Sequence, residues 1–205
     1  MRIFIDGACI DLSDEVELAR RLMKGDETAR ELFVETFRRK VFQYSYLSCG
    51  QREDAEEVAQ ETLLKVWEHF AELREPEHVK TWVFRIARNI CLTRRRRSEF
   101  APSEELSIEK LPTQWFHALV DPGEMPEHAA YLGELRKLLA KVIHGLPEKY
   151  RSVLVMRDLE EMSIEDTVAI LDVSESVVKT RLKRARGLIR KRLEGEGILS
   201  LSAID

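Results

Sequence analysis

Basic side chains crowd the segment from Val177 to Leu193, and their chemistry suits nucleic acid. Lysine and arginine bind phosphate oxygens, which position a protein on DNA without specifying sequence. Apolar residues between them recur at helical spacing and predict an inward-facing stripe. The alternative is a solvated basic helix in a bundle. The basic residues are Lys179, Arg181, Lys183, Arg184, Arg186, Arg190, Lys191 and Arg192, and the stripe is Val178, Leu182, Ala185, Leu188 and Ile189.

The residues before this segment predict a helix-turn-helix. Ser163 can cap a short helix over residues 164–171, and Ser174 can cap the basic helix over residues 175–193. Between them Asp172, Val173 and Ser174 predict a tight turn, and aspartate can adopt the left-handed conformation at some cost. In DNA-binding versions of the motif, the second helix reads base edges in the major groove. The combination favours DNA binding over a merely solvated helix.

A second basic stretch runs from Val79 to Arg97 and contains no acidic residue. Cations that follow a nucleic acid backbone, with an aromatic side chain for stacking, are typical of single-strand binding. Trp82 supplies the aromatic ring, although taken alone it fits a core position better than an exposed one. Val83, Ile86, Ala87 and Ile90 predict the buried face of this helix.

The segment from Asp54 to Phe70 predicts an amphipathic helix with an acidic outer face. Its inner stripe is Ala55, Val58, Ala59, Thr62, Leu63, Val66, Trp67 and Phe70. Because an acidic face repels DNA, it favours a protein partner. A solvated helix face is the alternative. The outward residues are Glu57, Gln60, Glu61 and Lys65.

The helical pattern predicts two small domains joined by a long acidic linker. Two further helices are expected before residue 50, with a break near residues 24–26, and others over residues 131–146 and 147–159. Between residues 98 and 129, prolines interrupt the helical pattern. The predicted limits are an N-terminal extension (1–11), a first domain (12–97), a linker (98–129), a second domain (130–194) and a tail (195–205).

Composition narrows the function classes. The chain has 205 residues, a net charge of −4, and three cysteines, an odd number without metal-ligand spacing. It lacks a secretory signal and an apolar stretch long enough to span a membrane, so a cytoplasmic protein is expected. Its histidines are scattered, and no Gly-rich phosphate loop or nucleophile motif is present. No enzymatic activity, metal or cofactor is predicted.

Two of these segments resemble a known family. Residues 146–193 look like region 4 of bacterial sigma factors, and residues 54–70 with 80–97 look like region 2. With these two regions alone, the chain is similar to the extracytoplasmic function (ECF) group. The resemblance implies an all-α fold and a factor that binds core RNA polymerase and directs initiation at −35 and −10 promoter elements. It also implies promoter melting and a probable anti-sigma partner.

The resemblance assigns roles to the charged faces. The acidic face (Glu57, Gln60, Glu61, Lys65) would dock on the beta-prime coiled coil of polymerase, and region 4 on the beta flap. The −10 strand would contact Lys80, Trp82, Arg85, Arg88, Asn89, Arg94, Arg95, Arg96 and Arg97, with a specificity loop between Phe70 and Val79. The −35 duplex would contact Ser174, Ser176, Lys179, Thr180, Arg181 and Arg184.

Some residues depart from the family pattern. Val168 replaces a small alanine, and Glu175 and Ser176 replace small residues at the start of the recognition helix. Asp172 stands where the family usually has the glycine of the turn. These departures concern the promoter sequence that is read and not the fold. The alternative function is a stand-alone helix-turn-helix regulator of duplex DNA, which would not need the acidic docking face or a channel-length acidic linker.

Overall fold

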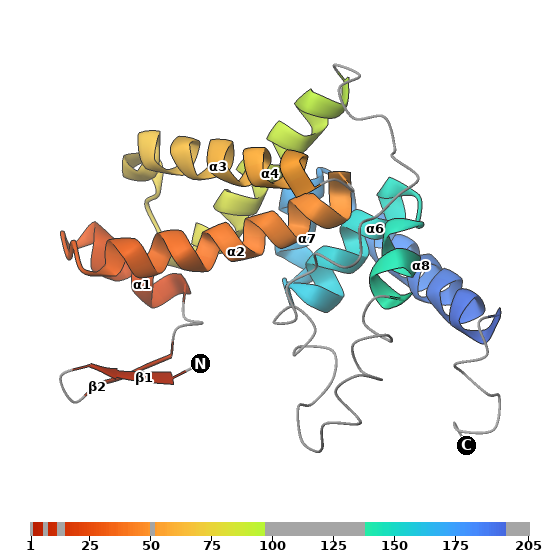
Figure 1. Cartoon of the computed structure of the whole chain (residues 1–205), viewed down its shortest axis with the longest axis horizontal. Helices are drawn as coiled ribbons and strands as arrows, with labels where there is room; N and C mark the ends of the chain where they lie inside the picture. The colour runs from red at the N-terminus through yellow and green to blue at the C-terminus, as the bar shows by residue number, and fades with distance from the viewer. Residues whose placement is uncertain (1, 6–7, 12–14, 50–51, 97–137, 196–205) are drawn as a thin grey trace. The chain divides into compact units, whose positions relative to one another are not determined.

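The computed structural model describes residues 2–5, 8–11, 15–49, 52–96 and 138–195. They belong to two compact units, one of residues 1–46 and 52–101, the other of residues 47–51 and 102–205 (Figure 1). The predicted all-α architecture of two helical domains is confirmed. The predicted linker and most of the predicted tail lie outside the described residues. No helix in the described ranges is both long and apolar enough to span a membrane.

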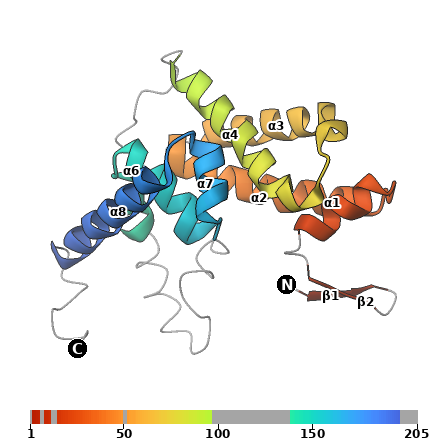
Figure 2. The same cartoon turned by 180° about the vertical axis from the view of Figure 1, so that it is seen from behind.

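The first unit is built from four α-helices and two short 3₁₀ turns. Figure 2 shows α2 and α3 side by side, with α4 crossing them. A two-stranded antiparallel hairpin, which the sequence analysis did not predict, precedes the helices. The elements are β1 (Arg2–Ile5), β2 (Ala8–Asp11), α1 (Glu15–Met23), α2 (Ala29–Cys49), α3 (Arg52–Glu68), η1 (Phe70–Glu72), η2 (Pro76–His78) and α4 (Val79–Arg96).

The predicted break between the first two helices is confirmed at Gly25. Gly25 has a φ of 82°, which glycine adopts without the Cβ strain of other residues. Asp26 fixes the turn, since its carboxylate accepts hydrogen bonds from Arg21 (2.7 Å) and from the Thr28 hydroxyl (2.6 Å). The bonds from Thr28 and then Arg21 lower the pKa of Asp26 to about 2.

Aromatic side chains hold α2 against α3. Phe33 is fully buried, with its ring centroid 4.6 Å from that of Phe37, 6.0 Å from Trp67 and 5.7 Å from Phe70. Six of the eight residues in the predicted stripe are buried, whereas Trp67 and Phe70 are half-buried, and Phe70 belongs to η1. Thr62 within the stripe satisfies its hydroxyl by donating to the Val58 carbonyl at 2.7 Å. With its inner face filled, α3 turns its carboxylates outward.

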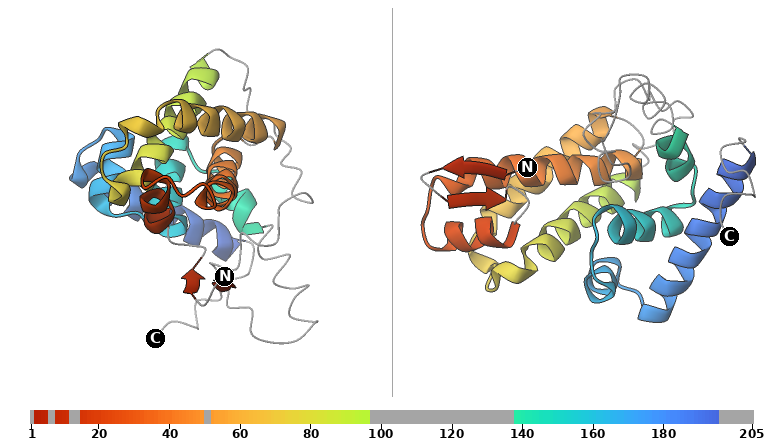
Figure 3. Two further views of the ribbon diagram at one scale, coloured as in Figure 1. Left: turned by 90° about the vertical axis from the view of Figure 1, so that its left-hand side faces the viewer. Right: turned by 90° about the horizontal axis from the view of Figure 1, so that it is seen from below.

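The second unit is the predicted helix-turn-helix with a preceding helix. Residues 138–144 are helical. Figure 3 shows α8, in blue, running past α6 and α7. The named elements are α6 (Glu148–Leu154), the π-helical turn η5 (Val155–Leu159), α7 (Ile164–Leu171) and α8 (Glu175–Gly195).

The structure contains the predicted cap of α7 and the predicted turn between α7 and α8. The Ser163 hydroxyl accepts a hydrogen bond from the Asp166 backbone N–H at 2.9 Å and caps α7. Asp172 ends α7 in the left-handed conformation (φ 53°, ψ 53°). α8 begins after Ser174, whose hydroxyl lies 3.0 Å from that of Ser176.

One buried position predicted for α8 is wrong. Val178 and Ala185 are fully buried, but Leu188 is 41% exposed. The buried residue near this end is Leu193. Helical spacing alone cannot show where a long helix leaves its core, because that depends on the lengths of the helices that cover it.

Asp172→Gly should stabilise the second unit. Glycine removes the Cβ strain of the left-handed residue, and a gain of about 0.5–1 kcal/mol in the free energy of unfolding is expected. Urea denaturation of the full chain measures it. Asp172→Ala is the control, because alanine tolerates this conformation less well than aspartate; a gain with alanine and none with glycine would contradict the argument.

Candidate nucleic-acid interface

The outer face of α3 carries the residues predicted to dock on a protein. Glu57, Gln60 and Lys65 are exposed and Glu61 is half-buried. Leu64 lies on the same face with 63% of its surface exposed. Leu64 was not predicted as a site residue, although the helical spacing already places it outside the inward stripe. Single exposed apolar residues are common on protein surfaces; here Leu64 adds an apolar side chain to an otherwise polar face.

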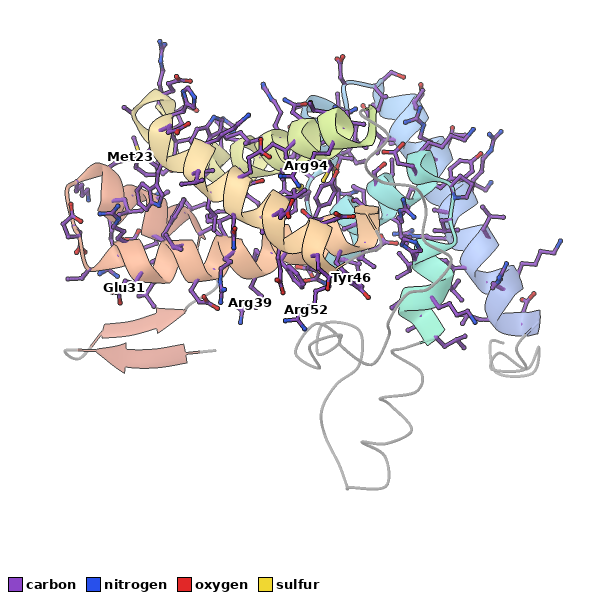
Figure 4. All side chains as sticks on the ribbon, turned by 45° about the horizontal axis from the view of Figure 1, so that its top comes forward. Met23, Glu31, Arg39, Tyr46, Arg52 and Arg94 are labelled. Carbon is purple, nitrogen blue, oxygen red and sulfur yellow. The ribbon has the colours of Figure 1, made fainter. Side chains whose placement is uncertain are left out.

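Arg94 of α4 lies against this face (Figure 4). Its guanidinium contacts Glu57 at 2.5 Å and Glu61 at 3.2 Å. Burial lowers the pKa of Arg94, but its hydrogen bonds to Glu57 and Glu61 outweigh this effect and raise the pKa above its usual value. The structure therefore pairs a residue predicted to bind DNA phosphates with two residues predicted to dock on protein.

A groove of about 320 Å³ runs between α3 and α4. It brings together residues that the sequence analysis assigned to different partners, since Glu61 and Lys65 form its α3 side and Trp82 and Asn89 its α4 side. Trp82 is half-buried, so its ring borders the groove instead of lying in the core. We call this the α3–α4 groove; its lining is Glu61, Lys65, His69, Glu72, Trp82, Ile86, Asn89, Ile90 and Thr93.

The remaining basic residues predicted on α4 do not share one environment. Arg85 is exposed, whereas Lys80 and Arg88 are half-buried. The side chains of Arg95 and Arg96, and the whole of Arg97, lie outside the described residues.

The loop between Phe70 and Val79 is held by its neighbours. Leu73 and Val79 are buried at its two ends. Arg20 of α1 contacts Glu77 at 2.9 Å. A backbone hydrogen bond and then the bond from Arg20 lower the pKa of Glu77. The contact between α1 and this loop could not be predicted from residue spacing, because the two segments are far apart in the sequence.

The outer face of α8 presents the residues predicted to read duplex DNA. Ser174, Ser176, Lys179, Thr180 and Arg184 are exposed and Arg181 is half-buried. Lys179 forms an ion pair with Glu175 one turn earlier. A second groove of about 320 Å³, the α6–α8 groove, is lined by Lys149, Tyr150, Ser176, Val177, Thr180, Arg181 and Arg184.

Three basic or aromatic residues of this unit have positions that the sequence analysis did not foresee. Lys149 and Tyr150 of α6 reach the recognition helix only through the packing of α6 on α8, which no spacing in the sequence reveals. Arg186 makes a two-pronged contact with Asp158 of η5, at 2.5 and 2.9 Å, and so ties α8 to the preceding turn. Among the described residues, no His, Cys, Asp or Glu cluster could hold a metal ion.

Comparison with known families and proteins gives matches over both units. Residues 33–100 match the family described as Sigma-70 region 2, and residues 136–189 match Sigma-70, region 4. The ECF RNA polymerase sigma factor SigW of Bacillus subtilis is 30% identical over 177 residues, covering 85% of this chain and 94% of SigW. The ECF RNA polymerase sigma-E factor of Escherichia coli is 29% identical over 189 residues, covering 89% and 95%.

Solved structures share the fold. The sigma factor RpoE in complex with the anti-sigma factor NepR from Bartonella quintana matches with a TM-score of 0.62 and 19% identity, covering 85% of this chain and 98% of that one. CnrH in complex with the cytosolic domain of CnrY matches with a TM-score of 0.60 and 21% identity, covering 90% and 99%.

A double-mutant cycle should detect the Arg94 contact. Arg94→Ala and Glu61→Gln are expected to show a coupling of about 0.5–1 kcal/mol in unfolding free energy, the range for partly exposed ion pairs. The coupling should shrink as salt is added, because salt screens such pairs. Arg85→Ala with Glu61→Gln is the matched control, since Arg85 is an exposed arginine of the same helix. Equal coupling in both cycles would contradict the specific contact.

Proposed function

The chain belongs to the ECF group of bacterial RNA polymerase sigma factors, and we propose how its described surfaces divide the work. As an alternative sigma factor, it directs promoter-specific transcription. In our proposal it catalyses no reaction itself, and the chemistry of RNA synthesis stays with core polymerase. It acts in the cytoplasm and joins the nucleoid when active.

The outer face of α3 is the proposed docking surface for the beta-prime coiled coil of polymerase. Glu57, Gln60, Glu61 and Lys65 supply polar contacts, and the exposed Leu64 adds an apolar one. Interfaces commonly combine a small apolar anchor with a polar rim. The contact of Arg94 with Glu57 and Glu61 supports this division, because it orients both carboxylates before the partner arrives.

The α3–α4 groove and the outer side of α4 are proposed to hold the opened −10 strand. Trp82 supplies a flat surface for base stacking at the edge of the bubble, and Asn89 a hydrogen-bonding amide. Lys80, Arg85, Arg88, Arg95, Arg96 and Arg97 are the proposed phosphate contacts. Arg94 can join them only by leaving its two carboxylates. The loop between Phe70 and Val79 would select the −10 base.

The outer face of α8 is proposed to read the −35 duplex. Ser174, Ser176, Lys179, Thr180, Arg181 and Arg184 stand on the side of the helix that faces solvent. Side chains near the start of a recognition helix reach base edges, and those further along reach phosphates. Region 4 would also contact the beta flap. Lys179 must exchange its partner Glu175 for DNA.

An anti-sigma protein is a further proposed partner. Two solved structures with this fold are complexes, one of RpoE with the anti-sigma factor NepR and one of CnrH with the cytosolic domain of CnrY. By analogy, a regulator that covers the α3 or α4 surfaces would block polymerase and promoter at once.

One observation carries the proposal: an acidic docking face and a basic helix-turn-helix occur in one chain on separate units. A stand-alone regulator of duplex DNA, the alternative function, has no use for the first of these. The two functions are distinguished by whether the chain needs polymerase to act at a promoter.

Run-off transcription with core polymerase on a library of promoters from the source genome tests the function. The wild-type chain should direct initiation from a discrete set of promoters. Gln60→Ala with Glu61→Arg should lower initiation by about tenfold or more, because it removes polar contacts and reverses a charge at the interface. Glu27→Arg is the control, because it reverses a charge in the same way at an exposed residue between α1 and α2.

Each outcome of this experiment has one meaning. Initiation that survives the double substitution would contradict the docking face. Specific binding of duplex by the wild-type chain alone, without initiation in the presence of polymerase, would favour the stand-alone regulator.

Trp82→Ala should impair promoter opening rather than polymerase binding. Initiation from fully duplex promoters is expected to fall by about tenfold, the value of one strong stacking contact. Templates with a pre-melted −10 region should restore most of the lost initiation, because on them the opening step is already complete. Phe substitution at Trp82 keeps a stacking ring and serves as the control. An equal loss on duplex and pre-melted templates would show that Trp82 acts elsewhere.

A further inference from the structure

The α6–α8 groove is a concave, positively charged feature beside the recognition helix. Its volume is about 320 Å³, with Lys149 and Tyr150 of α6 on one side and residues of α8 on the other. Its lining contains three cations and three hydroxyl groups and no carboxylate. Such a lining suits an anion that accepts several hydrogen bonds.

The groove is held in shape before any ligand arrives. α6 and α8 pack against each other, and Val153 and Val178 are fully buried on the two helices. The side chains in the groove are also linked, since Tyr150 is hydrogen-bonded to Arg184. The Lys149 ammonium lies 5.2 Å from the centre of the Tyr150 ring. Preorganised donors lose less conformational entropy on binding.

The cations around Tyr150 make the electrostatic potential in the groove positive, and they lower the pKa of this residue. The hydrogen bond with Arg184 lowers the pKa of Tyr150 most, and the charges of Lys149, Arg184 and Arg181 lower it further. A negative ligand placed between these groups would be attracted by all three.

We propose that the α6–α8 groove binds a backbone phosphate of the promoter duplex, with Lys149 as a direct contact and Tyr150 as a positioning residue for Arg184. The proposal rests on the proposed function, because it assumes that α8 enters the −35 duplex. It extends the DNA-binding surface from the recognition helix to α6, where the sequence analysis placed no contact.

The ligand is DNA rather than an acidic protein because the groove shares residues with the reading face of α8. Ser176, Thr180 and Arg184 belong to both. A helix in the major groove is flanked by the phosphates of both strands, so a cation beside it lies within reach of the backbone. A phosphate contact from a second helix would fix how deeply α8 inserts, without adding preference for a base.

The experiment uses holoenzyme made from core polymerase and the full chain. Its probe is a promoter that the run-off experiment has identified, and binding is followed by fluorescence anisotropy over a range of salt concentrations. For Lys149→Ala we expect affinity to fall about three- to tenfold at low salt, and the slope of log affinity against log salt to become shallower by about 0.9, the value for one lost phosphate contact. Lys141→Ala, the same change at an exposed lysine outside the groove, should leave both unchanged.

Two further comparisons separate a phosphate contact from other roles. The loss with Lys149→Ala should be the same on the natural and on a scrambled −35 element, because phosphates carry no sequence. Tyr150→Phe keeps the ring and removes the hydroxyl; it should weaken binding in the wild-type background and have no further effect with Arg184→Ala, since it acts through that arginine.

Several results would overturn the proposal. One is an unchanged salt slope for Lys149→Ala. Another is a weakened affinity for core polymerase without DNA, which would assign the groove to a protein partner. A wild-type chain that directs no initiation would instead overturn the proposed function, and it is recognised before any variant is made.

Discussion

The contact of Arg94 with Glu57 and Glu61 joins the two charged faces of the first unit, the acidic face of α3 and the basic helix α4. Glu57 and Glu61 are one helical turn apart, a spacing at which like charges repel. The inner face of α3 is filled by apolar residues, so neither carboxylate can turn inward. The guanidinium from α4 relieves the repulsion by contacting both carboxylates, and the Lys65 ammonium, 3.6 Å from Glu61, adds to this effect. A partner that docks on α3 therefore meets an arranged surface, and it must either include Arg94 or displace it.

The two grooves differ in charge, and the difference matches a division of labour. The α3–α4 groove mixes Glu61 and Glu72 with Lys65 and is bordered by Trp82. The α6–α8 groove is lined by three cations, three hydroxyl-bearing residues and Val177, without a carboxylate. Duplex DNA attracts through its phosphates, whereas an unpaired base binds through stacking. This contrast supports the proposal that the second unit binds intact duplex and that the first binds bases that have left it.

Signals that act within a few residues were predictable. The break at Gly25, the cap at Ser163 and the left-handed Asp172 follow from local conformation, and the buried stripe of α3 from its periodicity. Contacts between helices were not predictable, because they depend on crossing positions that no spacing encodes. Arg94 on the acidic face, Lys149 beside α8 and the exposed Leu188 belong to this class.

The placement of charge also explains why a net-acidic chain can act on DNA. With a net charge of −4, its overall field does not attract a polyanion. Cations that face solvent are instead gathered along α8, and Arg94 and Lys179 are already paired with carboxylates. The net negative charge partly offsets the nonspecific attraction between these cations and DNA phosphates. Under the proposed function, a partner docked on α3 would bring the duplex close and change what Arg94 can contact.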